Sequence, residues 1–181
     1  MTWLGRLLRN RRAGESTLAW HVPGLNAPDA LVLSSPDFAD GSAIPQRNAG
    51  RPVGDNVSPA LAWSGVPEGT AQLVLIVEDA DVPLSRPITH AVARFSPSLT
   101  GVAAGELEAG AVHGDGIGAF GRRGYHGPRP VPGHGAHSYV FQLYALDRPI
   151  PGDRTLRPRT VVEAMSGHVL ARGRITGTYE R

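Results

Sequence analysis

Apolar residues fill one short stretch of the chain and alternate with more polar residues in several others. Residues 71–77 are nearly all apolar and often β-branched, which predicts a strand that is buried on both faces. Residues 88–95 and 137–146 alternate from one side to the other, as strands do. Shorter patterns at 31–34 and 172–179 predict an opening and a closing strand. The pattern as a whole favours a structure made mainly of strands.

Two further segments add to this picture. Thr160 and Glu163 have the spacing of a capping box, in which each side chain bonds to the other residue's backbone N–H, so a helix is expected over residues 161–170. Residues 97–123 are rich in glycine and alanine and show little periodicity, which predicts a long irregular loop. Loops of this length in compact domains are often functional.

Length and composition agree with a single domain. A chain of 181 residues is long enough to bury a substantial core. Its 23 glycines and 16 prolines are spread between the apolar stretches rather than gathered in a repeat, which indicates many turns. We therefore expect an all-β fold.

The beginning of the chain is amphipathic and basic. Apolar side chains recur at helical spacing across residues 3–12, so a short helix is expected there. The charged residues of this stretch are all arginines, namely Arg6, Arg9, Arg11 and Arg12. The remaining 14 basic and 16 acidic side chains nearly balance, so no nucleic-acid partner is expected. We interpret residues 1–28 as a basic arm that makes peripheral contact with an anionic membrane, packs on its own domain (residues 29–181), or is a frayed terminus.

Several kinds of chemistry are excluded by residues that the chain lacks. Without cysteine there is no disulfide, no thiolate metal site and no cysteine nucleophile. Without lysine there is no Schiff-base chemistry and no P-loop lysine. No stretch approaches 18 consecutive apolar residues, and the apolar start is shorter than the core of a signal peptide. A cytoplasmic protein is therefore expected.

Polar residues that could bind a ligand follow the most apolar predicted strand and lie at the start of the aromatic one. Asp79 and Asp81 are two residues apart, so both carboxylates would lie on one face and bind a cation or an ammonium, or else accept backbone N–H groups in an Asx-turn. His137 and Tyr139 share a face of their strand and follow a glycine and proline scaffold. Backbone N–H groups, a histidine and a tyrosine suit phosphate or carboxylate better than a metal. His134 and His137 lie outside any predicted helix, so we predict no metal site.

Together these segments resemble the phosphatidylethanolamine-binding protein family, particularly its bacterial branch of Raf-kinase-inhibitor-like proteins. The resemblance extends over residues 31–181. Its ordered markers are residues 55–59, 61–67, Asp79, Asp81, Pro83, His90, 124–128, 137–139, 143–147 and 177–181. It implies an antiparallel β-sandwich with a large sheet, a smaller sheet and a few peripheral short helices, and a small anion pocket. The ligand-binding residues that it implies are Asp79, Asp81, Pro83, His90, Gly127, Pro128, His137 and Tyr139.

The chain departs from the usual family pattern at Ala80, Val82 and Ala91. Alanine stands at position 91 where an aromatic residue commonly follows the pocket histidine, and this should enlarge the mouth of the pocket. We expect a non-catalytic binding protein for phosphate, phosphoethanolamine-like headgroups or similar small anions. It would need no cofactor and could modulate a protein partner. The sequence does not determine the oligomeric state, and a homodimer is one of the states it allows. The alternatives are a small-substrate hydrolase that uses Asp79 and His137, and a scaffold whose partner docks on residues 97–123.

Overall fold

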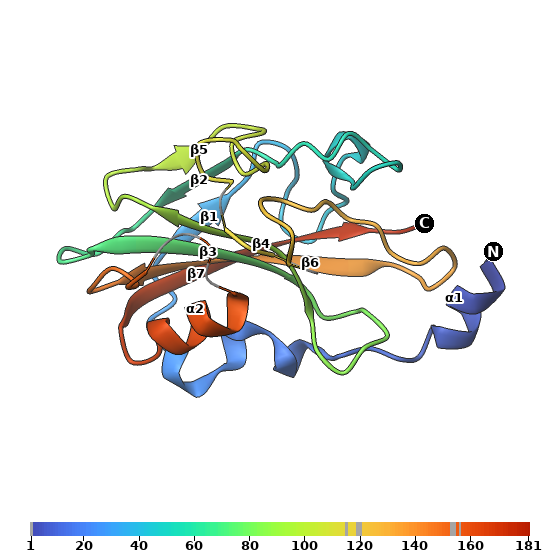
Figure 1. The fold of residues 1–181 in the computed structure, drawn as a ribbon, viewed down its shortest axis with the longest axis horizontal. Coiled ribbons are helices and arrows are strands. Elements are labelled where there is room, and N and C mark those ends of the chain that lie inside the picture. The colour runs from blue at the N-terminus through green and yellow to red at the C-terminus, as the bar shows by residue number, and fades with distance from the viewer. Residues whose placement is uncertain (1, 115, 119–120, 153–154, 156) are drawn as a thin grey trace.

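Two antiparallel β-sheets form the body of the chain in a computed structural model that describes residues 2–114, 116–118, 121–152, 155 and 157–181 (Figure 1). The larger sheet has the strand order β4-β3-β6-β7 and the smaller one the order β1-β2-β5. The strands are β1 (Val32–Ser34), β2 (Leu61–Ser64), β3 (Gln72–Asp79), β4 (Ile88–Phe95), β5 (Gly101–Val102), β6 (His137–Leu146) and β7 (Val169–Tyr179). The predicted all-β sandwich is confirmed.

The helices are short and peripheral. They are α1 (Thr2–Leu8), α2 (Pro158–Met165) and the 3-10 turns η1 (Glu15–Thr17), η2 (Ala19–His21), η3 (Pro23–Leu25) and η4 (Gln46–Asn48). Helix α2 and the turns η2 and η3 cover the outer face of the larger sheet, opposite the smaller sheet (Figure 1). The larger sheet is therefore the middle of three layers.

Strand β3 has no polar face because both of its sides are buried. Leu73 and Leu75 point into the core between the two sheets, where pairs of aromatic rings pack at centroid distances of 5.5 Å (Phe38 with Phe141) and 5.1 Å (Trp63 with Phe95). Its alternate residues pack on the outer face against residues of the helical layer such as Trp20 and Met165. Burial on both faces is as predicted for residues 73–77, whereas Ala71 is exposed and precedes the strand, which begins at Gln72.

Two short strands, β2 and β5, were not predicted from the sequence. Strand β2 has only four residues between turns, and its alternation of buried and exposed positions is too brief to stand out. Strand β5 lies inside the segment 97–123 that we expected to be an irregular loop, and it pairs with β2 through Leu61 opposite Val102. Because β5 has only two residues, its ordering depends on this pairing rather than on a local pattern.

The position of α2 differs from the expected one. The helix begins at Pro158, whose fixed φ suits a first helical turn, and ends at Met165. Thr160 lies inside the helix and caps nothing, so the capping-box prediction is wrong. Glu163 instead forms an ion pair with Arg159, one helical turn earlier, at 2.8 Å. Because the helix ends early, β7 begins at residue 169 rather than 172.

Glu78 fastens the helical layer to the larger sheet. Its carboxylate accepts hydrogen bonds from the Ala19 N–H (2.8 Å) and the Gln142 amide (2.9 Å), and only 6% of the residue is exposed. Burial raises the pKa of this carboxyl above its ordinary value of 4.5, against the smaller opposing effect of the two hydrogen bonds. The folded state therefore holds the Glu78 proton more tightly than the unfolded state does.

This gives a pH-dependent prediction for Glu78→Gln. The contribution of Glu78 to the free energy of unfolding is greatest below pH 4.5 and declines as the pH rises toward the raised pKa of the folded state. The variant cannot ionise there, so its stability relative to the wild type should increase with pH above 4.5, measured by urea unfolding at a series of pH values. Glu163→Gln, which alters an exposed carboxylate, should show no such trend. A constant difference between Glu78→Gln and the wild type would contradict the prediction.

Candidate ligand-binding site

A cavity of about 670 Å³ lies at one end of the sandwich. It is lined by the end of β3, the beginnings of β4 and β6, and parts of the loops over residues 50–56, 82–84 and 122–131. Neighbouring antiparallel strands alternate in direction, so the end of β3 and the starts of β4 and β6 meet at this edge. The volume is in the range of small-molecule sites, about 300–1,000 Å³.

Most of the predicted ligand-binding residues line this cavity. They are Asp79, Pro83, His90, Gly127, His137 and Tyr139. The register of β3 and β6 places Asp79 directly opposite Tyr139. The other two predicted residues lie outside the lining. Asp81 sits in the loop behind Asp79, and Pro128 is buried, with its carbonyl accepting the Gly50 N–H at 3.0 Å.

A β-bulge brings His90 to the cavity. Val77 pairs with Ala91 and Glu78 pairs with Thr89, so His90 is an extra residue without a partner on β3. Simple alternation placed His90 and Ala91 on opposite sides of the sheet, and the bulge changes this. The His90 ring packs edge-on against Tyr139 at 5.0 Å, while Ala91 lies in the core between the sheets. Ala91 is outside the cavity lining, so the expected widening of the mouth at this position is wrong.

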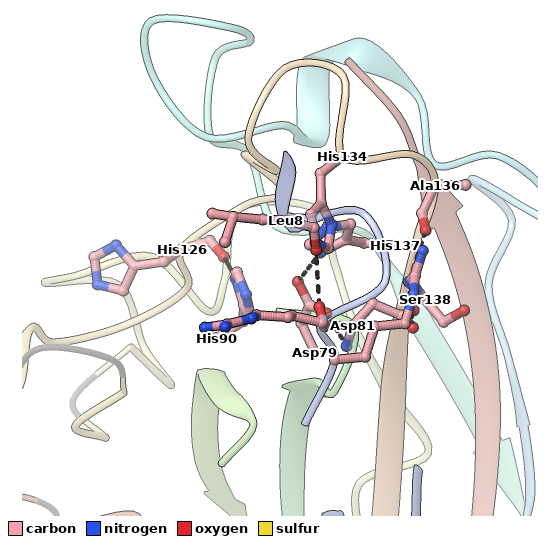
Figure 2. A network of polar contacts seen from close by, with 11 residues as sticks. Leu8, Asp79, Asp81, His90, His126, His134, Ala136, His137 and Ser138 are labelled. Atoms are coloured by element: carbon pink, nitrogen blue, oxygen red, sulfur yellow. Dashed lines mark hydrogen bonds and ion pairs between the residues drawn. The ribbon is translucent and has the colours of Figure 1, made fainter. Parts of the chain in front are cut away.

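His90 and His126 bind each other through their backbones and one ring (Figure 2). The His126 N–H donates to the His90 carbonyl at 2.8 Å, and the His90 Nδ1 donates in turn to the His126 carbonyl. Burial lowers the pKa of His90, which keeps its ring neutral near pH 7 and leaves Nε2 as an acceptor. This Nε2 is buried and has no hydrogen-bond partner in the described part of the chain.

A chain of hydrogen bonds runs from the N-terminal arm to Asp79 (Figure 2). His134 Nε2 donates to the Leu8 carbonyl at 2.9 Å and lies 3.2 Å from the Arg11 carbonyl. His134 Nδ1 lies 2.7 Å from His137 Nε2, and His137 Nδ1 lies 2.7 Å from Asp79 Oδ2. All three side chains are buried.

These contacts tie Asp79 to the N-terminal arm. Because a carbonyl only accepts, His134 donates from Nε2 toward Leu8, and its Nδ1 faces His137. His137 Nδ1 in turn contacts Asp79 Oδ2 in a buried ion pair. The carboxylate of Asp79 is therefore engaged by His137 rather than left without a protein partner.

Asp79 and Asp81 also organise the loop that follows β3. The Asp81 N–H donates to Asp79 Oδ1 at 2.8 Å, which is the Asx-turn that the sequence allowed. Asp81 Oδ2 accepts the Ser138 N–H at 2.7 Å, and Asp81 Oδ1 forms an ion pair with Arg12 of the arm at 2.5 Å. The second carboxylate thus joins the loop, β6 and the arm, away from the cavity.

Several functional candidates in the cavity were missing from the predicted set. The cationic ones are Arg51, Arg122 and Arg129, which line the cavity with their exposed side chains. Asn56 braces one wall, where its side chain accepts the Gly127 N–H at 2.9 Å and donates to the Tyr125 carbonyl at 3.0 Å. Asn56 adopts a φ of 62°, which asparagine tolerates better than most residues. It belongs to one of the family markers, whereas the arginines carried no signal in the sequence.

The sandwich and its end cavity define a ligand-binding protein fold, and the comparisons identify the family. The family model for phosphatidylethanolamine-binding protein matches residues 34–180. The chain therefore belongs to the phosphatidylethanolamine-binding protein family.

Relatives and solved structures agree with this membership. A UPF0098 protein of Methanothermobacter thermautotrophicus is 38% identical over 83% of this chain and 99% of its own length. The solved homologue CT736 of Chlamydia trachomatis is 34% identical with a TM-score of 0.75, and Escherichia coli YbcL is 26% identical with a TM-score of 0.79. Each structure covers 84% of this chain and is itself covered over 99%.

The described residues contain neither a membrane-spanning helix nor a cluster of metal ligands. None of the helices is long and apolar enough to cross a membrane. One relative, LppC of Mycobacterium tuberculosis, is named as a candidate lipoprotein and is 35% identical over 85% of this chain. A cytoplasmic location therefore stays a prediction. Within the same residues, no group of three or more histidine, aspartate or glutamate side chains is arranged to hold a metal ion.

Proposed function

We propose that the cavity binds a small molecule carrying a phosphate or carboxylate group. The observation that carries this proposal is the charge of the lining. Arg51, Arg122 and Arg129 bring three guanidinium groups to the lining, whereas Asp79, the one carboxylate among the described lining residues, is engaged by His137. Guanidinium groups bind phosphate and carboxylate through paired, charge-assisted hydrogen bonds.

The base of the cavity favours a ligand that also donates hydrogen bonds. His90 Nε2 is an acceptor without a partner in the described chain, and its ring belongs to the lining. Burial, followed by the charge of Asp79, raises the pKa of the Tyr139 hydroxyl, so Tyr139 stays protonated at neutral pH. A headgroup such as phosphoethanolamine combines an anion for the arginines with an ammonium for the acceptors. This chemistry supports phosphoethanolamine-like ligands over inorganic phosphate alone.

The hydrolase alternative receives no support from this arrangement. Both ring nitrogens of His137 are engaged, one by Asp79 and one by His134, so neither is available to accept a proton from water. The described lining contains no serine, threonine or cysteine to act as a nucleophile. We therefore favour binding.

Two neighbouring arginines provide a matched test. Arg122 lines the cavity and Arg123 does not, although both are exposed. Arg122→Ala should weaken phosphoethanolamine binding by roughly 10- to 150-fold, since a hydrogen bond to a charged group contributes about 1.5–3 kcal/mol. Arg123→Ala should bind as the wild type does. Isothermal titration calorimetry with phosphate, acetate and phosphoethanolamine measures each affinity. Equal affinities of the two variants would contradict the site, and no binding of any of the three anions to the wild type would overturn the proposed function.

A further inference from the structure

Helix α1 contacts the domain through the side of the helix that lies opposite its apolar face. Gly5 is buried, and a Cβ atom there would lie 2.2 Å from the Pro132 carbonyl oxygen and 2.7 Å from the His134 nitrogen. The Leu8 carbonyl accepts from His134 on the same side. A glycine allows the helix to approach the loop this closely.

The other side of α1 carries large apolar side chains that face solvent. Trp3, Leu4 and Leu7 share one face by helical spacing, and they are 69%, 43% and 73% exposed. If the arm packed on the domain through its apolar side chains, this face would be buried. It is instead exposed to solvent. Trp3 is also the one exposed tryptophan of the three, since Trp20 and Trp63 are buried.

Positive charge surrounds this apolar face. Arg6, Arg9 and Arg11 are exposed, and none forms an ion pair with a described residue. The fourth arginine, Arg12, is held by Asp81. An apolar stripe with tryptophan and leucine, flanked by arginines and without an acid, is the composition of helices that lie in the interface of an anionic bilayer.

A second apolar side chain lies at the same end of the molecule. Leu84 is 53% exposed on the loop between β3 and β4, and it also lines the cavity. Figure 1 shows this loop and α1 at the end of the sandwich where β6 begins. A bilayer that accepts the helix would therefore meet the end of the domain that holds the cavity.

We infer that the exposed apolar face of α1, formed by Trp3, Leu4 and Leu7, docks on the surface of an anionic phospholipid membrane together with Arg6 of the helix and Arg9 and Arg11, which follow it. The positive charge of the three arginines favours an anionic membrane over a neutral bilayer. Membrane docking of this face does not require anion binding in the cavity, because the side chains that would contact the bilayer belong mainly to residues 3–11.

Tryptophan fluorescence and vesicle sedimentation test this inference on the full chain. Vesicles of equal parts phosphatidylcholine and phosphatidylglycerol should bind the protein and shift the emission of Trp3 to shorter wavelength, whereas pure phosphatidylcholine should bind far more weakly. Raising the salt from about 0.1 M to about 1 M should weaken binding, since the Debye length falls from about 10 Å to about 3 Å. The double variant Trp3→Ser with Leu7→Ser should lose on the order of tenfold or more in affinity.

A matched control and three contrary outcomes complete the test. Val32 is 64% exposed, and its strand β1 lies away from α1 (Figure 1), so Val32→Ser should bind vesicles as the wild type does. Unchanged vesicle binding by the double variant, or no binding of the wild type to anionic vesicles at low salt, would overturn the inference. A fluorescence shift that depends on protein concentration without vesicles would assign the face to self-association and would also overturn it. The calorimetric test of the cavity is unaffected by any of these results.

Discussion

Asp79→Ala is expected to lower the free energy of unfolding by about 3–5 kcal/mol, the usual cost of removing one member of a buried ion pair. Asp79 and His137 are nearly inaccessible, with side chains 3% and 2% exposed, and their polar atoms are 2.7 Å apart. Without the carboxylate, the His137 ring and the Asp81 N–H both lose a buried partner. Urea unfolding measured at constant pH reports the loss.

A double-mutant cycle separates the pair from the rest of the site. Asp79→Ala with His137→Ala should cost less than the sum of the two single variants, by at least about 1 kcal/mol, because residues in one hydrogen-bond network are coupled. Asp81→Ala serves as the comparison, since it removes a partly exposed ion pair with Arg12, about 1 kcal/mol or less, and the hydrogen bond from the Ser138 N–H, but no contact with His137. If the effects of the two single variants on the free energy of unfolding were strictly additive, the contact between Asp79 and His137 would contribute no interaction energy.

Gly127→Ala is expected to destabilise the protein by about 3 kcal/mol, the upper end for overpacking, and to abolish ligand binding. A Cβ atom at Gly127 would lie 2.0 Å from the Asn48 carbonyl oxygen and 2.6 Å from the Gly50 nitrogen. Both are backbone atoms and cannot rotate away as a side chain would. The wall between Gly127 and Gly50 must therefore shift, and this wall is part of the cavity.

Gly118→Ala is the control for this substitution. The nearest atom to its Cβ would be the Thr89 carbonyl oxygen at 3.1 Å, a contact that small local movements relieve. Thermal unfolding and calorimetry of both variants measure stability and affinity. Wild-type stability and affinity in Gly127→Ala would show that the wall is more pliable than its contacts indicate.

The major strands could be predicted because their local patterns reflect their final environment. Strands β4 and β6 begin and end where the alternation of residues does, and residues 73–77 of β3 are all apolar because both faces of this strand are buried. Strands β2 and β5 could not be predicted, since they are defined by pairing across about 40 residues. The helix α2 was misplaced because Thr160 and Glu163 match a capping box by chance, while Pro158 sets the actual start.

The site was predictable where residues occur in recognisable motifs and not where it depends on bulges or distant loops. Asp79, His137 and Tyr139 were expected together, and the register of β3 and β6 brings them to one edge. The orientation of His90 depends on a bulge that no local pattern marks. The role of His134 depends on carbonyl groups of the arm, more than 120 residues earlier. Such contacts are made by the folded chain and leave no periodic trace.

His134 has a thermodynamic consequence, because one imidazole ring touches both the arm and the base of the cavity. Its two nitrogens face Leu8 on one side and His137 on the other. Any ligand that alters the bond between His134 and His137 also alters the free energy with which the arm is held. Linkage makes this effect reciprocal, so the packing of Leu8 of the arm on His134 of the domain changes the affinity for that ligand by the same factor. The two ends of this hydrogen-bond chain therefore share one coupling free energy.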